Sequence, residues 1–184
     1  MAAGALVLVV GPSGAGKDTL IAGAKAAFAD DARFVFPRRI VTRQAVAALE
    51  DHDSVAPEVF AAEKARGAYA LDWQAHGLSY GLPVALEAEI AAGRVVVANV
   101  SRHVVPAALT KYGNGHVLLV TARPEIRAER LSGRGRESAE DVAARLKREG
   151  PLMPADVAVE EIDNSGTLAD GIGRFTAALL RIVG

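Results

Sequence analysis

The stretch that decides the fold reads Gly11-Pro12-Ser13-Gly14-Ala15-Gly16-Lys17. It follows an apolar, valine-rich run at 5–10 and precedes a helical pattern at 17–29. Up to the lysine, its spacing fits the phosphate-binding loop G-x-x-x-x-G-K-[ST]. Backbone N–H groups of such a loop point inward, and the following helix adds the positive end of its dipole. The alternative, a glycine-rich turn that binds nothing, is disfavoured because strand, loop, lysine and helix all agree.

The position after the lysine departs from this pattern. Asp18 stands where a Ser or Thr hydroxyl ordinarily contacts Mg²⁺, and Thr19 follows it. We expect a requirement for Mg²⁺, with Thr19 or an oxygen of Asp18 as the protein ligand. An acidic residue is also expected at the end of another core strand, but the run at 95–98 is followed by Asn99. The metal is therefore expected to be held largely by water and phosphate.

Along the rest of the chain, short apolar runs alternate with helical patterns. Strands are predicted at 5–10, 34–42, 94–100, 116–121 and 157–162. Helices are predicted at 17–29, 57–66, 83–92, 124–132, 139–149 and 168–183. This alternation predicts an α/β protein of the P-loop NTPase fold, with a parallel core sheet and helices on both faces.

Two stretches interrupt the alternation, and we interpret both as inserts around the nucleotide site within a single domain spanning residues 1–184. The first is a flap at about 38–81, which contains an aromatic, glycine-rich run at 73–81. Trp73 and Tyr80 in this run either stack on a base or build the core of the flap, and core packing is favoured. The second is an arginine-rich lid at about 132–150. Such segments can close over a substrate and exclude water.

Composition excludes several classes of protein. With 184 residues and 51% hydrophobic side chains the chain can bury a full core, and a net charge of -1 provides no excess that would attract nucleic acid or an anionic membrane. The absence of cysteine excludes disulfides and thiol catalysis. The start lacks a basic leader pattern, and no apolar run is long enough to span a membrane. We expect a soluble, cytoplasmic protein, and the sequence leaves open whether it forms a homodimer.

Arginines concentrate between 123 and 148. For Arg123 and Arg127, a solvated helix face paired with Glu125 and Glu129 is as well supported as phosphate contact. Phosphate contact is favoured for Arg130, Arg134, Arg136 and Arg145, because guanidinium groups neutralise charge in phosphoryl transfer. With Lys17, the residues assigned to catalysis are Arg130, Arg134 and Arg145, and Arg136 is assigned to the substrate.

With these motifs in order, the chain resembles the guanylate kinase-like branch of P-loop kinases. The residues that carry the likeness are the loop at 11–17, Thr42-Arg43, Trp73, His76-Gly77, Tyr80-Gly81, Arg130-Leu131, Arg134-Gly135 and Arg145-Leu146. The guanine-reading side differs, since Gln44-Ala45-Val46 follows Arg43 and Leu82 follows Tyr80-Gly81.

The chain is more similar to the ribose 1,5-bisphosphate phosphokinases. The shared features are Lys17-Asp18-Thr19, Ile40-Val41-Thr42-Arg43, Glu50-Asp51-His52, Leu78-Ser79-Tyr80-Gly81, Asn99-Val100-Ser101-Arg102 and Arg134-Gly135-Arg136-Glu137. The resemblance implies ATP and Mg²⁺ as cofactors, ATP binding by Gly11 to Asp18, and transfer to a sugar phosphate in phosphonate breakdown. It also suggests Arg43, Tyr80, Ser101 and Arg102 as substrate contacts. His52 either hydrogen-bonds the substrate or packs.

Two other functions stay open at this point. A guanylate or other nucleoside monophosphate kinase has the same architecture but requires the missing guanine-side residues. A guanylate kinase-like module that binds a partner without catalysis is disfavoured, because Gly16 and Lys17 are both kept.

Overall fold

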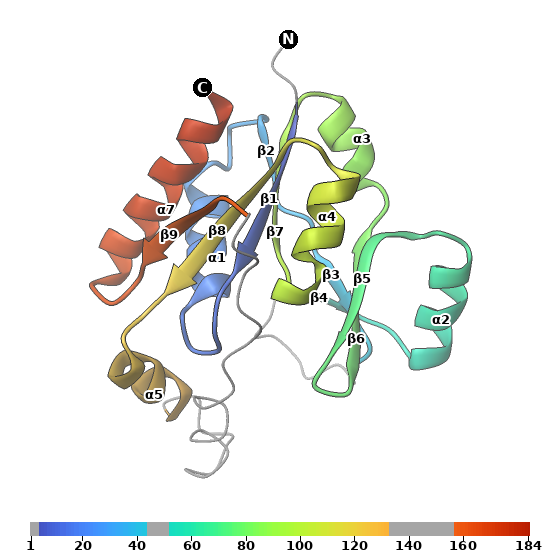
Figure 1. Cartoon of the computed structure of the whole chain (residues 1–184), viewed down its shortest axis with the longest axis horizontal. Helices are drawn as coiled ribbons and strands as arrows, with labels where there is room; N and C mark the ends of the chain where they lie inside the picture. The colour runs from blue at the N-terminus through green and yellow to red at the C-terminus, as the bar shows by residue number, and fades with distance from the viewer. Residues whose placement is uncertain (1–3, 44–51, 133–156) are drawn as a thin grey trace.

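The structure is a computed structural model, and it describes residues 4–43, 52–132 and 157–184. Five strands pair in parallel to form the central sheet, in the order β2-β7-β1-β8-β9. β1 occupies the middle of this sheet (Figure 1). Every one of its residues is buried. The strands are β1 (Ala5–Val10), β2 (Phe34–Val35), β7 (Val95–Asn99), β8 (Gly115–Thr121) and β9 (Val159–Asp163).

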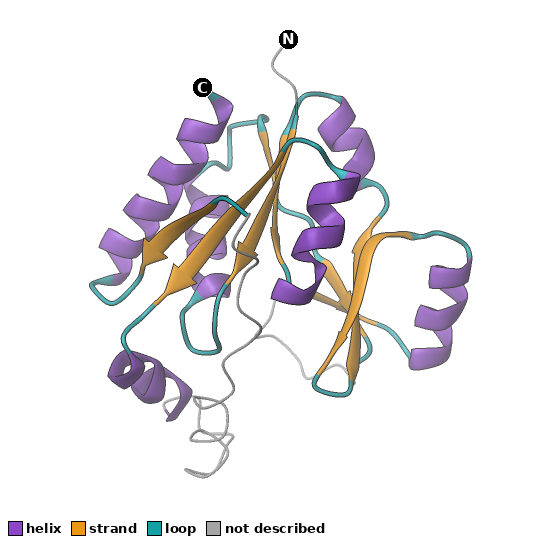
Figure 2. Cartoon of the chain, viewed as in Figure 1, coloured by secondary structure: helices purple, strands orange, loops and turns teal. Residues whose placement is uncertain are grey.

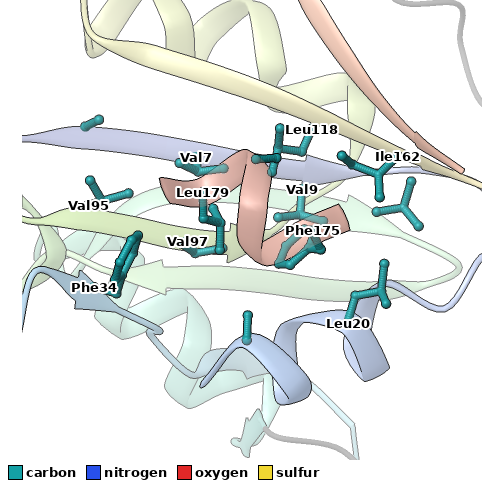
Figure 3. Packing of buried hydrophobic residues seen from close by; sticks show 14 of the residues in the cluster. Val7, Val9, Leu20, Phe34, Val95, Val97, Leu118, Ile162, Phe175 and Leu179 are labelled. Atoms are coloured by element: carbon teal, nitrogen blue, oxygen red, sulfur yellow. The ribbon is translucent and has the colours of Figure 1, made fainter. Parts of the chain in front are cut away.

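Helices cover both faces of the central sheet, as the alternation of patterns predicts. On one face, Val7 and Val9 pack with Phe175 and Leu179 of α7 (Leu168–Val183) and with α1 (Lys17–Ala27) (Figure 3). On the other face, the alternate residues of β1 pack against α3 (Leu86–Ala91) and α4 (Val105–Lys111). The α/β class with a parallel core is therefore confirmed.

The predicted flap contains a second, four-stranded sheet in the order β4-β3-β6-β5 (Figure 2). Its strands are β3 (Arg39–Val41), β4 (His52–Ser54), β5 (Tyr69–Ala75) and β6 (Leu78–Pro83), and α2 (Pro57–Ala65) connects β4 to β5. The aromatic, glycine-rich run forms the β5–β6 hairpin, whose two turn residues His76 and Gly77 both have positive φ. Trp73 lies opposite Tyr80 in this hairpin, and the two rings stack with centroids 5.5 Å apart.

Two predictions about elements were wrong, and two further elements were missed. The strand predicted at 34–42 is two strands, β2 and β3, which lie in different sheets and are separated by Pro37. The helix predicted to begin at Pro83 begins at Leu86, because Pro83 ends β6. The helix α4 and the short 3-10 turn before it at Arg102–Val104 were not predicted.

In the last part of the chain, two predicted helices match the structure and one prediction is not tested. The predicted helices at 124–132 and 168–183 match α5 (Pro124–Ser132) and α7 in full. The predicted helix at 139–149 and the lid beyond residue 132 lie outside the described residues.

Candidate active site

The phosphate-binding loop leaves the carboxyl end of β1 and enters α1 at Lys17. Gly16 caps this helix with φ 94°, a left-handed conformation that favours glycine. A Cβ at Gly16 would lie 2.5 Å from the side chain of Asn164, and one at Gly14 would lie 2.9 Å from the carbonyl oxygen of Arg127. The loop therefore requires glycine because other parts of the protein pack closely against it.

Lys17 lies among like charges. Its Nζ donates hydrogen bonds to the carbonyl oxygens of Gly11, at 2.7 Å, and Pro12, at 3.2 Å. Burial is the main cause that lowers the pKa of Lys17 to about 8; Asp18 opposes this shift, and the positive charges of three arginines add to it. Those arginines are Arg39, Arg102 and Arg127.

These cations come from four separate segments: the start of α1, the start of β3, the turn after β7, and α5. Like charges gathered in this way repel one another unless an anion lies between them. The arrangement is therefore suited to a ligand with several negative charges.

Two arginines of α5 and one asparagine hold the loop from outside. Arg127 Nε donates to the carbonyl oxygen of Ser13 at 3.0 Å, and Arg130 Nη1 donates to that of Ala15 at 3.3 Å. Asn164 Nδ2 donates to the same Ala15 oxygen at 2.8 Å, while Arg130 Nη2 donates to the backbone oxygen of Asn164 at 2.9 Å. For Arg127, the alternative of a solvated face paired with glutamates is therefore wrong.

Asn164 was not among the predicted site residues. It is almost fully buried and directly follows β9, at the carboxyl end of the parallel sheet. Ligands of open α/β sheets bind at this end of the sheet. A polar residue just after a predicted strand was therefore the signal in the sequence that could have identified Asn164 as a site residue.

The two departures from the loop pattern, Asp18 and Asn99, lie in contact. Asn99 is buried at the end of β7, beside Val9 of β1, and its Nδ2 donates to Asp18 Oδ1 at 2.6 Å. The same carboxylate oxygen accepts from Arg39 Nη2 at 3.2 Å. The acidic group expected at the strand end is thus replaced by an amide that positions a carboxylate on α1.

The donors near Lys17 fit a hard cation such as Mg²⁺. Asp18 is half-exposed, and both of its described hydrogen bonds end on Oδ1, so Oδ2 is available to a cation. Thr19 is exposed in the first turn of α1. Mg²⁺ binds carboxylate and hydroxyl oxygens and usually completes its shell with water and substrate phosphates. In the described residues no group of three or more His, Cys, Asp or Glu side chains forms a metal cage.

The predicted substrate residues lie in three places. Ser101 and Arg102 follow β7, and Ser101 Oγ accepts from the backbone N–H of His103 at 3.4 Å. Arg43 is exposed just after β3, and Tyr80 stacks on Trp73 in the hairpin.

The remaining predicted positions are at the far side of the second sheet or beyond the described chain. His52 begins the edge strand β4, in register with Arg39 of β3. Arg134, Arg136 and Arg145 lie outside the described residues.

The sequence is similar to named kinases over nearly its whole length. A ribose 1,5-bisphosphate phosphokinase PhnN from Brucella melitensis is 49% identical over 177 residues, which cover 96% of this chain and 90% of the relative. One from Methylobacterium radiotolerans is 49% identical over 176 residues, covering 96% and 97%. This chain belongs to the ribose 1,5-bisphosphate phosphokinase family. The family also includes longer proteins: a bifunctional ribose 1,5-bisphosphokinase-thymidine phosphorylase from Azorhizobium caulinodans is 47% identical over 98% of this chain, which spans 26% of that relative.

Solved structures place the family's fold among P-loop kinases. A guanylate kinase from Anaplasma phagocytophilum superposes with a TM-score of 0.71 at 15% sequence identity, covering 98% of this chain and 86% of the other. A gluconokinase from Sinorhizobium meliloti gives a TM-score of 0.54, also at 15% identity. No protein-family model matches the chain. In the part of the chain that the structure describes, no helix is both long and apolar enough to cross a bilayer.

Proposed function

We propose that this kinase transfers the γ-phosphoryl group of ATP to ribose 1,5-bisphosphate and forms 5-phospho-α-D-ribose 1-diphosphate and ADP. The observation that carries the proposal is the gathering of Lys17, Arg39, Arg102 and Arg127 at one end of the central sheet. A loop with one cationic side chain is enough to bind a single anionic substrate. Two polyanionic substrates repel each other, so bringing them together requires cations beside each of them. The names of the relatives that are 49% identical support the choice of acceptor.

The chemistry requires no proton abstraction from the acceptor. The 1-phosphate of the sugar is already anionic at neutral pH, and one of its oxygens attacks the γ-phosphorus. The bond from the γ-phosphorus to its bridging oxygen breaks, and ADP leaves with that electron pair. His52 and His76 are therefore not needed as general bases. What the protein supplies is position and charge neutralisation.

The loop binds ATP through residues 11–19, and Lys17 contacts the β- and γ-phosphate oxygens. Arg130 keeps the loop in shape, and together with Arg134 and Arg145 it is assigned to neutralising the transferred group. Asp18 and Thr19 would hold Mg²⁺, which would supply positive charge to neutralise the phosphates.

The acceptor is assigned to the opposite side of the loop. There, Arg43, His52 and Tyr80 of the second sheet and Ser101 and Arg102 after β7 are its proposed contacts, and Arg136 is assigned to the acceptor as well. The two sheets act as one kinase domain, working in the cytoplasm and in phosphonate breakdown.

The test is a substrate panel read out by ADP release, with ATP and Mg²⁺ present and the sugar product identified by mass spectrometry. Ribose 1,5-bisphosphate should be consumed, and Lys17→Ala should reduce kcat/KM by several orders of magnitude. No ADP above background with the sugar bisphosphate would contradict the proposal. Turnover of GMP in its place would identify a nucleoside monophosphate kinase instead, which the guanylate kinase-like fold also accommodates.

A further inference from the structure

Arg39 is a cation that links the second sheet to the phosphate-binding loop. It begins β3, yet its Nη2 forms an ion pair with Asp18 on α1 at 3.2 Å. The side chain is 18% exposed, so most of it lies inside the protein. The ion pair with Asp18 offsets the cost of removing this charge from water and fixes the guanidinium beside the loop.

The described contacts use little of the hydrogen-bonding capacity of Arg39. Its guanidinium carries five N–H donors, and in the described residues one of them is engaged, with Asp18 Oδ1. That oxygen is shared, because it also accepts the shorter bond from Asn99. The ion pair thus places the guanidinium next to the loop while leaving most of its donors for another acceptor.

Arg39 lines a cavity that lies between α1, the end of β7 and the segment joining β2 to β3. The cavity has a volume of about 130 Å³, and its polar lining consists of Arg39, Asp18, Asn99 and Lys25. Ile21 and Phe36 contribute to an apolar wall. This size suits a phosphate group with part of a sugar.

Neither Lys17 nor any residue of α5 lines this cavity. Arg39 and Arg127 both lower the pKa of Lys17, but they reach it from the second sheet and from α5 respectively. Arg127 is bonded to the loop itself, through the carbonyl oxygen of Ser13, whereas Arg39 is not. Arg127 therefore belongs to the nucleotide side and Arg39 to the side from which an acceptor approaches.

We propose that Arg39 binds a phosphate group of the acceptor, with Asp18 and Asn99 holding its guanidinium toward the loop, and that this contact selects a phosphorylated sugar. The inference rests on the proposed function, because it takes the acceptor to be a sugar bisphosphate. A guanidinium forms two parallel hydrogen bonds to phosphate, which an ammonium group does not. Arginine at position 39 should therefore bind the acceptor more tightly than lysine would.

Steady-state kinetics of Arg39→Gln, with Arg33→Gln as the control, test the proposal. Arg33 is 55% exposed and pairs with Asp31 at 2.7 Å, just before β2 and away from the carboxyl end of the central sheet. Arg39→Gln should raise the KM for ribose 1,5-bisphosphate by roughly 10- to 100-fold, while the KM for ATP changes by less than about twofold. Arg33→Gln should change neither constant beyond about twofold.

Arg39→Lys and a binding measurement keep the test independent of folding. Arg39→Lys keeps the charge but loses the paired donors, so its acceptor KM should lie between those of the wild type and Arg39→Gln. Calorimetric titration with ribose 1,5-bisphosphate and no nucleotide should show the tightest binding for the wild type, weaker binding for Arg39→Lys and the weakest for Arg39→Gln. The melting temperature and ATP affinity of each variant show that the loop is intact.

The possible failures are separable. If the wild type turns over ribose 1,5-bisphosphate and Arg39→Gln has the acceptor KM of Arg33→Gln, the role of Arg39 is refuted and the proposed function stands. An equal rise in the KM values for ATP and acceptor would also refute it, since Arg39 would then support the loop as a whole. If the wild type does not turn over the sugar bisphosphate, the proposed function itself fails.

Discussion

The surroundings of Lys17 suit phosphate binding, but they also destabilise its positive charge while no phosphate is bound. Burial and three nearby arginines lower its pKa to about 8, whereas a free lysine has a pKa of 10.5. A base whose pKa is lowered on folding costs stability while it is protonated. That cost is present below the folded pKa and disappears as the pH rises toward the unfolded value.

This pKa predicts the pH dependence of both activity and stability. The kcat/KM for ATP should fall above about pH 8, as Lys17 in the free enzyme loses its proton, while kcat at saturating ATP should fall only at higher pH because bound phosphate stabilises the ammonium. Initial-rate profiles from pH 6 to about pH 10 measure both limbs.

A stability series provides the control for that profile. Lys17→Met lacks the buried charge at every pH, whereas the wild type loses it only as the pH rises through 8. The melting temperature of the variant minus that of the wild type should therefore decrease as the pH rises through 8. A difference that does not vary with pH would show that the pKa of Lys17 is not lowered in the folded protein.

Asn164 determines the position of the loop from within the core. Its Nδ2 donates to the carbonyl oxygen of Ala15, and its side chain lies within close contact of Gly16 and Gly171. Asn164→Ala should lower the free energy of unfolding by about 1–3 kcal/mol, because the bond is buried. It should also raise the KM for ATP.

Urea unfolding and ATP kinetics measure these two effects. Asn114→Ala is the control: Asn114 Nδ2 donates to the carbonyl oxygen of Gly4 at 3.0 Å, at the other end of β1. It should lower stability and leave the KM for ATP unchanged. If both variants change that KM equally, Asn164 has no specific role at the loop.

The helix α5 acts as a clamp on the loop. Its backbone approaches Gly14 closely enough to exclude a side chain, and Arg127 and Arg130 each donate to a loop carbonyl. Its amphipathic sequence pattern is compatible with a solvated arginine stripe. Only the placement of the helix against the loop brings those arginines to the loop carbonyls.

We predict that Arg127→Ala raises the KM for ATP by about tenfold, because a charged hydrogen bond that shapes the loop is lost. Arg123→Ala is the matched control, since Arg123 is exposed just before α5 and its described hydrogen bond to Ser165 uses the backbone N–H. Steady-state kinetics with ATP varied compare the two. Equal effects of both substitutions would assign the change to overall charge and not to the clamp.

Across the molecule, the second sheet and the central sheet share a core. Leu6 and Leu8 of β1 belong to the same buried cluster as Leu71 and Trp73 of β5. Lys111 of α4 also donates to the carbonyl oxygen of Ala70 at 3.0 Å. We therefore predict that the two sheets unfold as one cooperative unit.

Phe175→Ala tests this coupling from the opposite face. The fully buried ring of Phe175 packs against β1, and its removal should lower the free energy of unfolding by about 3–5 kcal/mol. Trp73 is the single tryptophan and lies in the second sheet, so its fluorescence reports on that sheet while circular dichroism reports mainly on the helices. In urea, both signals should shift together.

Leu180→Ala is the control on the same helix, because Leu180 is 45% exposed, and it should change stability by less than about 0.5 kcal/mol. If Phe175→Ala moves the dichroism transition and leaves the fluorescence transition in place, the two sheets unfold separately.

The sequence by itself determined the features that depend on neighbouring residues. The loop at 11–17, the buried strand at 5–10 and the helices at 124–132 and 168–183 all follow from local spacing and end signals, and the structure has them at the predicted bounds. The resemblance in short motifs likewise placed the chain in its family, which the relatives confirm.

Only the tertiary structure decided which distant residues meet. Asn99 lies 81 positions from Asp18, and Asn164 lies 149 positions from Ala15, yet both pairs are hydrogen-bonded. These contacts follow from the order and register of the strands, in which β7 pairs with β1 and β9 with β8. The split at Pro37, which carries Arg39 into a second sheet facing the loop, arises in the same way. Local patterns specify the conformation of a segment, but the packing of whole sheets specifies its neighbours.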